Sequence, residues 1–97
     1  MTDLQCPATA VLLDGAAALP AWLTRLRIAG RFDAADREDI VTVVDATADL
    51  YRGETFVVTA AARDIEGALI ARGLPPGVPA VIEVDSTGWR RTPLPGA

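Results

Sequence analysis

Closely spaced glycine and proline turns are the feature that most restricts the fold of this 97-residue chain. The turns divide it into six segments, with breaks at residues 14–15, 30, 53, 73–79, 86–88 and 93–96. A chain of this length holds one hydrophobic core, because two halves would each be too small to fold unaided. We therefore expect one domain over residues 1–97, with 93–97 as a Pro-rich tail.

Five stretches within these segments have patterns typical of single elements. Residues 8–13 (ATAVLL) form a short apolar run before an Asp-Gly turn, which predicts a buried strand. Residues 54–59 (ETFVVT) predict a second strand, and the alternation over 80–85 predicts a third, with residues 89–92 returning as its antiparallel partner. Apolar residues at helical spacing predict a helix over 61–72, which Gly73 would end.

A further helix is predicted between Leu19 and Ala29. Its apolar residues recur at helical spacing, Pro20 suits the first turn, and Gly30 suits the end. Three cations gather toward its C-terminal end, where they would either complement the helix dipole or form a patch for a ligand or partner: Arg25, Arg27 and Arg31.

The middle segment carries two conflicting signals. Six of the eight residues from 40 to 47 are β-branched, which favours a strand, yet they do not alternate. A helix is favoured by Asp33 and Asp36 before the apolar run, by Gly53 behind it, and by a row at helical spacing made of Ile40, Val44, Thr47 and Tyr51. We prefer the helix and keep the strand as the alternative.

These elements predict an α+β fold. With a helical middle segment the order is β-α-α-β-α-β-β, a small, mainly antiparallel sheet with two or three helices packed on one face. With residues 40–47 extended, the order becomes a βαββαβ ferredoxin-like unit.

Missing residue types exclude most enzyme chemistry. The chain has no His, Lys or Asn and a single Cys, Cys6. Disulfides within the chain, Cys/His zinc sites, imidazole bases and Schiff-base lysines are thereby removed. We expect a protein that is not an enzyme and that holds no cofactor and no metal.

Net charge and hydropathy limit the classes of binding partner and the cellular location that we expect. Nine arginines against thirteen acidic residues give a net charge of -4, which disfavours binding to nucleic acid or to an anionic membrane. No apolar stretch reaches membrane-spanning length, and the first residues are acidic, unlike a secretory signal. We expect a cytoplasmic protein, and the lysine-free, Ala- and Arg-rich composition indicates a GC-rich bacterium or its phage.

Two acidic groupings are candidate sites. The run Asp33, Asp36, Glu38 and Asp39 would be a metal site or, as we prefer, the anionic start of a helix. Asp45 and Asp49 would lie one turn apart on a helix, either as an acid/base pair or, as we prefer, on a solvated face.

The sequence therefore predicts binding to another molecule rather than catalysis. Tryptophan and arginine are enriched at interface hot spots, so Trp89, Arg90 and Arg91 are candidate partner-binding residues together with the three cations above, although Trp89 would equally cap the sheet. The predicted function is a non-catalytic protein–protein interaction or assembly module, which binds another protein or itself as a homo-oligomer through an exposed sheet edge. The alternative is a winged-helix DNA-binding regulator with helix 61–72 in the groove and residues 80–92 as the wing.

Overall fold

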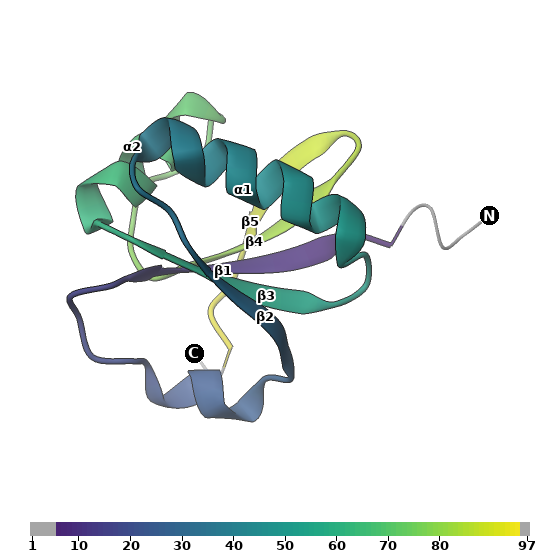
Figure 1. Ribbon diagram of the computed structural model, residues 1–97, viewed down its shortest axis with the longest axis horizontal. Coiled ribbons are helices and arrows are strands. Elements are labelled where there is room, and N and C mark those ends of the chain that lie inside the picture. Colours follow the sequence, from purple (N-terminus) through teal and green to yellow (C-terminus); the bar gives the residue numbers. More distant parts are fainter. Residues whose placement is uncertain (1–5, 96–97) are drawn as a thin grey trace.

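The computed structural model describes residues 6–95 as a small α+β fold, a five-stranded mixed sheet with two α-helices on one face and a 3-10 helix on the other (Figure 1). In chain order the elements are β1 (Ala8–Asp14), η2 (Ala21–Arg25), β2 (Ile28–Asp33), α1 (Arg37–Leu50), β3 (Thr55–Ala60), α2 (Ala62–Ala71), β4 (Ala80–Asp85) and β5 (Gly88–Thr92). The last two residues of the predicted 93–97 tail lie outside the described range.

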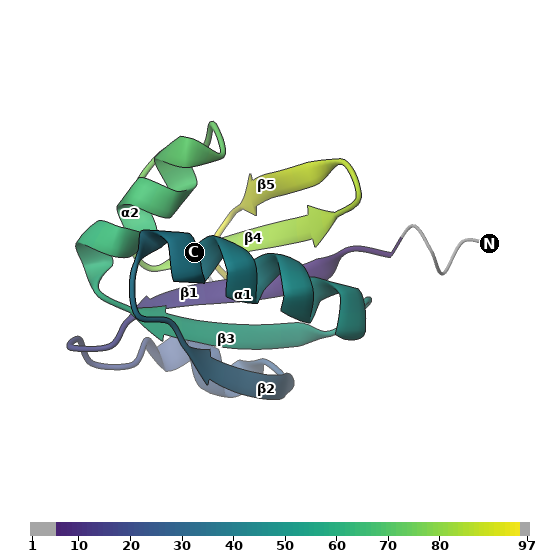
Figure 2. The same cartoon turned by 45° about the horizontal axis from the view of Figure 1, so that its top comes forward.

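The sheet is mixed, so the prediction of a mainly antiparallel sheet is wrong. The strand order is β2-β3-β1-β4-β5. Strand β3 runs parallel to both of its neighbours, β1 and β2, whereas β4 runs antiparallel to β1 and β5. Helix α1 makes the parallel β2–β3 pair, because parallel neighbours need a long crossover and a helix supplies it. Figure 2 shows α1 lying along the strands on the helical face.

The central strands carry a core on each face of the sheet. Beneath α1 and α2, the fully buried side chains include Leu12, Ile40, Phe56, Ile65 and Ile82. On the opposite face a smaller cluster of Val11, Leu13, Val57 and Val81 is covered by Leu23 from η2. Burial on both faces explains the continuous apolar runs of β1 and β3.

The predicted helix from Leu19 to Ala29 does not form. Only Ala21–Arg25 make a 3-10 helix, and Ile28–Asp33 form strand β2. Its residues alternate between half-buried and exposed. Phe32 packs against the core cluster beneath α1, whereas Ile28 packs against the smaller cluster on the opposite face, because the pairing with β3 shifts between Ile28 and Gly30. Gly30, predicted to end a helix, lies inside this strand, where a Cβ would come 2.9 Å from the Tyr51 hydroxyl.

The middle segment is helical, as preferred, so the ferredoxin-like alternative is wrong. Helix α1 begins after Asp36, whose carboxylate accepts the Asp39 backbone N–H at 2.8 Å. The β-branched Ile40, Val44 and Thr47 turn inward and pack, so burial outweighs their small helical disadvantage. Asp33, predicted as part of this start, belongs to β2 instead.

The remaining predicted elements are confirmed within one or two residues at each end: the strands at 8–13, 54–59 and 80–85, the helix at 61–72 and the return strand at 89–92. Gly73 follows α2 with a φ of 76°, the left-handed conformation that glycine adopts freely. No helix in the described range is long and apolar enough to cross a membrane.

Candidate functional site

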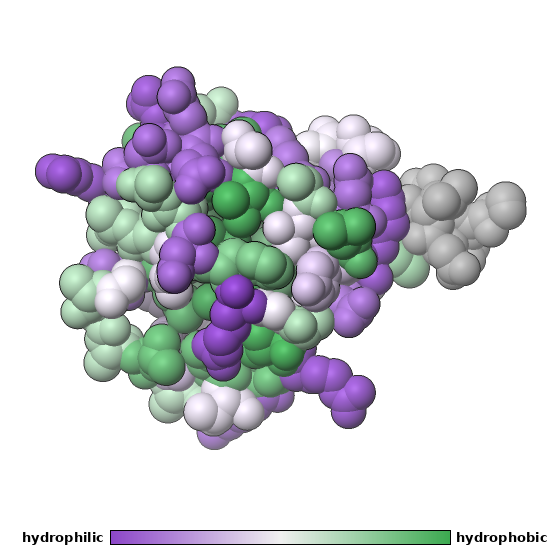
Figure 3. All heavy atoms as spheres, viewed as in Figure 1, coloured by the Kyte–Doolittle hydropathy of each residue, from purple (hydrophilic) through white to green (hydrophobic). Residues whose placement is uncertain are grey.

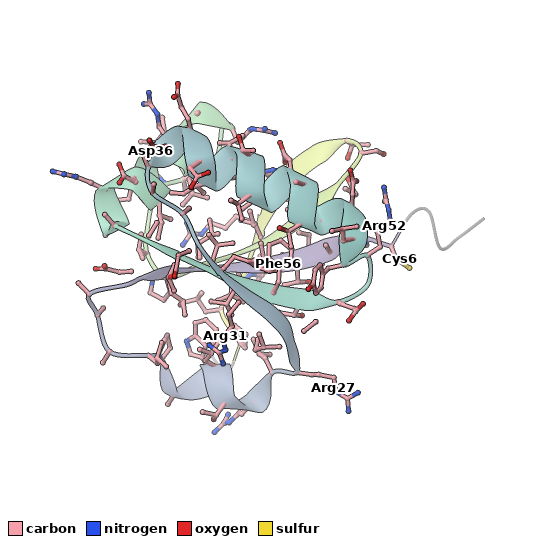
Figure 4. The ribbon with its side chains drawn as sticks, viewed as in Figure 1. Cys6, Arg27, Arg31, Asp36, Arg52 and Phe56 are labelled. Atoms are coloured by element: carbon pink, nitrogen blue, oxygen red, sulfur yellow. The ribbon has the colours of Figure 1, made fainter. Side chains whose placement is uncertain are left out.

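A charged cleft of about 430 Å³ lies between the C-terminal half of α1, the end of α2 and the β4–β5 turn. Its lining carries three carboxylates, two guanidinium groups and two hydroxyls, from Asp45, Asp49, Asp85, Arg52, Arg72, Ser86 and Thr87. Figure 4 shows Arg52 at the C-terminal end of α1. Whether these charged groups are available to a ligand depends on how they are paired with one another.

Asp45 is held by two partners on other elements. Its Oδ1 accepts the indole N–H of Trp89 at 2.8 Å, and its Oδ2 pairs with Arg72 at 2.5 Å. The Arg72 guanidinium also lies over the Trp89 ring, 4.8 Å from its centre. Asp45 therefore ties α1 to α2 and β5.

The predicted Asp45–Asp49 pair does not form an acid/base dyad. Asp49 pairs with Arg52 at 3.2 Å, while Asp45 is committed to Arg72 and Trp89. Each carboxylate thus has its own cation.

The β4–β5 turn is organised around Asp85. Its carboxylate accepts the Thr87 hydroxyl at 2.6 Å and the Thr87 backbone N–H at 2.9 Å, and it pairs with Arg90 at 3.0 Å. The Thr87 hydrogen bonds, and then Arg90, lower the pKa of Asp85 from 3.8 to about 2. In return, Asp85 and then Glu83, 3.4 Å away, raise the pKa of Arg90. This turn is an internally satisfied charge network.

Arg91 fastens the connector between α2 and β4. Its guanidinium donates to the carbonyls of Pro75 at 2.9 Å, Gly77 at 3.1 Å and Pro79 at 3.3 Å. Trp89, two residues earlier on the same side of β5, is only 6% exposed and belongs to the main core. All three residues of the predicted Trp89–Arg91 site are therefore engaged within the chain.

The acidic run before α1 serves the helix N-terminus. Asp36 caps the helix, and Asp39 Oδ2 accepts the Ala35 backbone N–H at 2.8 Å in return. Asp33 lies on β2 and accepts the Thr59 hydroxyl. Within residues 6–95, no group of three or more His, Cys, Asp or Glu side chains is placed to hold a metal ion.

The three remaining predicted residues lie on and beside strand β2. Arg25 ends η2, Arg27 precedes β2 and Arg31 lies inside it, all exposed. None has an ion-pair partner among residues 6–95. Figure 4 shows Arg27 pointing away from the molecule and Arg31 on the side of the sheet where η2 lies. The structure therefore leaves the cations of this region free, in contrast to those of β5.

Strand β2 is also an open edge of the sheet. It pairs with β3 only, and Figure 1 shows it crossing in front of β3 with no strand beyond it. Figure 3 shows the molecule in the same orientation as Figure 1. The middle of the surface that faces the viewer is apolar, and hydrophilic side chains lie across it. Arg27 and Arg31 were named from the sequence but the edge strand was missed, because Gly30 was assigned to the end of one helix and Asp33 to the start of the next. The alternation of Gly30 and Phe32 with Arg31 and Asp33 was the signal for a strand.

Comparisons with known proteins add no relative: no family model, no curated protein and no solved structure matches this chain.

Proposed function

We propose that this chain is a non-catalytic protein-binding module whose partner pairs with the edge strand β2. The observation that carries the proposal is the unpaired outer side of Ile28–Asp33, flanked by arginines that have no ion-pair partner within residues 6–95. An exposed strand edge offers main-chain hydrogen bonds to an extended segment, and the side chains beside it select which segment binds.

The contrast between the two edges of the sheet supports β2 over β5. At β5, Arg90 is paired with Glu83 and Asp85, and the guanidinium of Arg91 is held by hydrogen bonds to three backbone carbonyls. Pro93 follows β5 directly, and a proline has no N–H to offer a neighbouring strand. Strand β2 contains no proline, and its Arg31 is free of ion pairs to any described residue. A negatively charged partner would therefore gain more binding free energy from ion pairs at β2 than at the Trp89–Arg91 end.

The residue types support binding rather than catalysis. The chain has no histidine or lysine to serve as a base near neutral pH. In the charged cleft, Asp45 and Asp49 each bind a different arginine, so the two carboxylates do not act as a pair. Cys6 is exposed, and the single serine, Ser86, lies in the β4–β5 turn.

The nucleic-acid alternative has less support. Arg72, on the helix that would enter the groove, is bound to Asp45, and the wing cations Arg90 and Arg91 are bound within the chain. A winged-helix domain has the order helix, helix, strand, helix and hairpin, and this chain differs from it because the predicted first helix is only a 3-10 turn, Ala21–Arg25, followed by strand β2. A salt-dependent gel shift with random duplex DNA would revive this alternative.

Site-specific cross-linking tests the proposal. A photo-reactive amino acid is placed at the exposed Ala29 of β2 and, as a matched control, at the exposed Ala71 of α2. After irradiation in cells of the source organism, we expect protein adducts from position 29 and none of the same mass from position 71. The proposal is overturned if position 29 gives no adduct, or if both positions give the same set.

A further inference from the structure

We propose that the partner at the β2 edge is a second copy of this chain, paired antiparallel with the two Phe32 residues facing each other on the two-fold axis. This inference rests on the proposed function and names its partner. In the resulting dimer the two five-stranded sheets join into one continuous sheet.

The backbone of β2 fixes which residues meet a partner strand. The Ala34 N–H donates to the Thr59 carbonyl at 2.9 Å, and Phe32 pairs with Val58. In a parallel pair the residues that bond to the neighbour alternate, so Arg31 and Asp33 direct their N–H and C=O groups away from β3. A partner strand therefore forms its hydrogen bonds with these two residues.

Only certain registers are compatible with this direction. Outward-facing residues must lie opposite outward-facing residues, so the pairing of two β2 strands shifts in steps of two residues. Centred on residue 31 the strands oppose arginine to arginine, and centred on residue 33 they oppose aspartate to aspartate. Centred on Phe32, each Arg31 lies opposite the other copy's Asp33. This register forms two hydrogen-bonded pairs, with four main-chain hydrogen bonds between them.

The side chains fit the same register on both faces of the strand. Arg31 and Asp33 are both exposed and, being two residues apart, lie on the same face, so the dimer gains two cross-strand ion pairs. On the other face, Phe32 is only half-buried, with its ring edge-on to Tyr51 at 6.0 Å and to Phe56 at 6.2 Å. Pairing covers the exposed part of each Phe32 with its symmetry mate.

The dimer is expected to be weak and concentration-dependent, because one short strand buries less surface than a standard interface. Sedimentation velocity from about 5 µM to about 500 µM therefore covers the expected range of dissociation constants. We expect the wild type to shift from monomer to dimer across this range.

Charge reversal tests the register. Either Arg31→Glu or Asp33→Arg turns both attractive pairs into repulsive ones, and we expect each to raise the dissociation constant about ten- to thirtyfold. The double variant, Arg31→Glu with Asp33→Arg, restores complementary charges and the dimer. An equimolar mixture of the two single variants forms a heterodimer, although each alone stays monomeric.

Matched controls separate the register from net charge and from folding. Arg63→Glu and Glu66→Arg make the same charge changes on the exposed face of α2 and should leave the dimer unchanged. Because Asp33 accepts a hydrogen bond from Thr59, the thermal unfolding of each variant is followed by circular dichroism. Arg31→Glu removes no hydrogen bond or ion pair within residues 6–95, so this variant tests the register without that complication.

Three results overturn the inference: a wild type that stays monomeric at the highest concentration, single variants that dimerise like the wild type, or a mixture that fails to form heterodimers. A monomeric wild type that still gives position-29 adducts with another protein refutes self-pairing and leaves the protein-binding function standing. The absence of both dimer and adducts refutes both proposals.

Discussion

Replacing Asp45 tests the contact that joins α1, α2 and β5. Asp45→Ala leaves the indole N–H of the buried Trp89 without its acceptor, which costs about 1–3 kcal/mol. Loss of the partly exposed ion pair with Arg72 adds at most about 1 kcal/mol. Alanine returns about 0.5 kcal/mol through its higher helix propensity. We expect the free energy of unfolding to fall by about 0.5–3.5 kcal/mol.

Asp45→Asn is the matched control, because its amide oxygen still accepts from Trp89 while the charge is lost. We expect it to cost about 1 kcal/mol or less. Urea unfolding is followed by fluorescence in a Trp22→Phe background, so that Trp89 is the only reporter, and by circular dichroism. Combining Asp45→Asn with Arg72→Gln in a double-mutant cycle measures the ion pair alone.

The decisive result is which of the two substitutions lowers the free energy of unfolding more. If Asp45→Ala costs no more than Asp45→Asn, the hydrogen bond to Trp89 does not support the core, and the description of Asp45 as the tie between three elements is refuted.

Three further predictions concern glycines and one carboxylate. Gly67→Ala should stabilise the chain by up to about 1 kcal/mol, because the new Cβ meets only the flexible Arg37 side chain, 2.8 Å away in its present position, and thermal melting checks this. Gly30→Ala should destabilise it by about 1–3 kcal/mol in urea unfolding, because its Cβ would meet the Tyr51 hydroxyl at 2.9 Å and a packed aromatic ring. The depressed pKa of Asp85, about 2, adds stability above pH about 4 that is lost as the pH falls toward 2, so Asp85→Asn should flatten the acid end of the stability profile.

The elements that the sequence identified correctly are those with local signals at both ends. Helix α1 has Asp36 as its N-cap and Gly53 beyond its last turn, and its inward row of Ile40, Val44 and Thr47 follows the helical period. These signals outweigh a run of β-branched residues, because β propensity largely reflects the packing that a side chain finds.

The predicted first helix failed because its true partner is distant in sequence. Ile28–Asp33 bond to β3, whose first residue lies 27 positions beyond Ile28. The leucine spacing upstream matched a helix, but Leu23 is buried under the opposite face of the sheet by a single 3-10 turn. At Gly67, likewise, the neighbour that the missing Cβ accommodates is the side chain of Arg37, 30 residues earlier in the sequence.

The six candidate contact residues share the residue types that are typical of interfaces, but their positions in the fold depend on contacts that spacing does not reveal. Trp89 meets Asp45 across 44 residues, and Arg91 meets carbonyls 12 to 16 residues earlier. Only the fold separates the arginines that hold the chain together from those without an ion pair to any described residue.

The signs of the charges on β2 distinguish protection of an edge from recognition of a copy. An edge that only needs to resist aggregation is served by charges of one sign, which repel an identical strand in every register. Strand β2 instead carries Arg31 and Asp33 two residues apart on one face. Opposite charges at that spacing attract an identical antiparallel strand in one register and repel it in the two adjacent ones. The same two side chains therefore disfavour unrelated neutral strands and favour a single self-pairing.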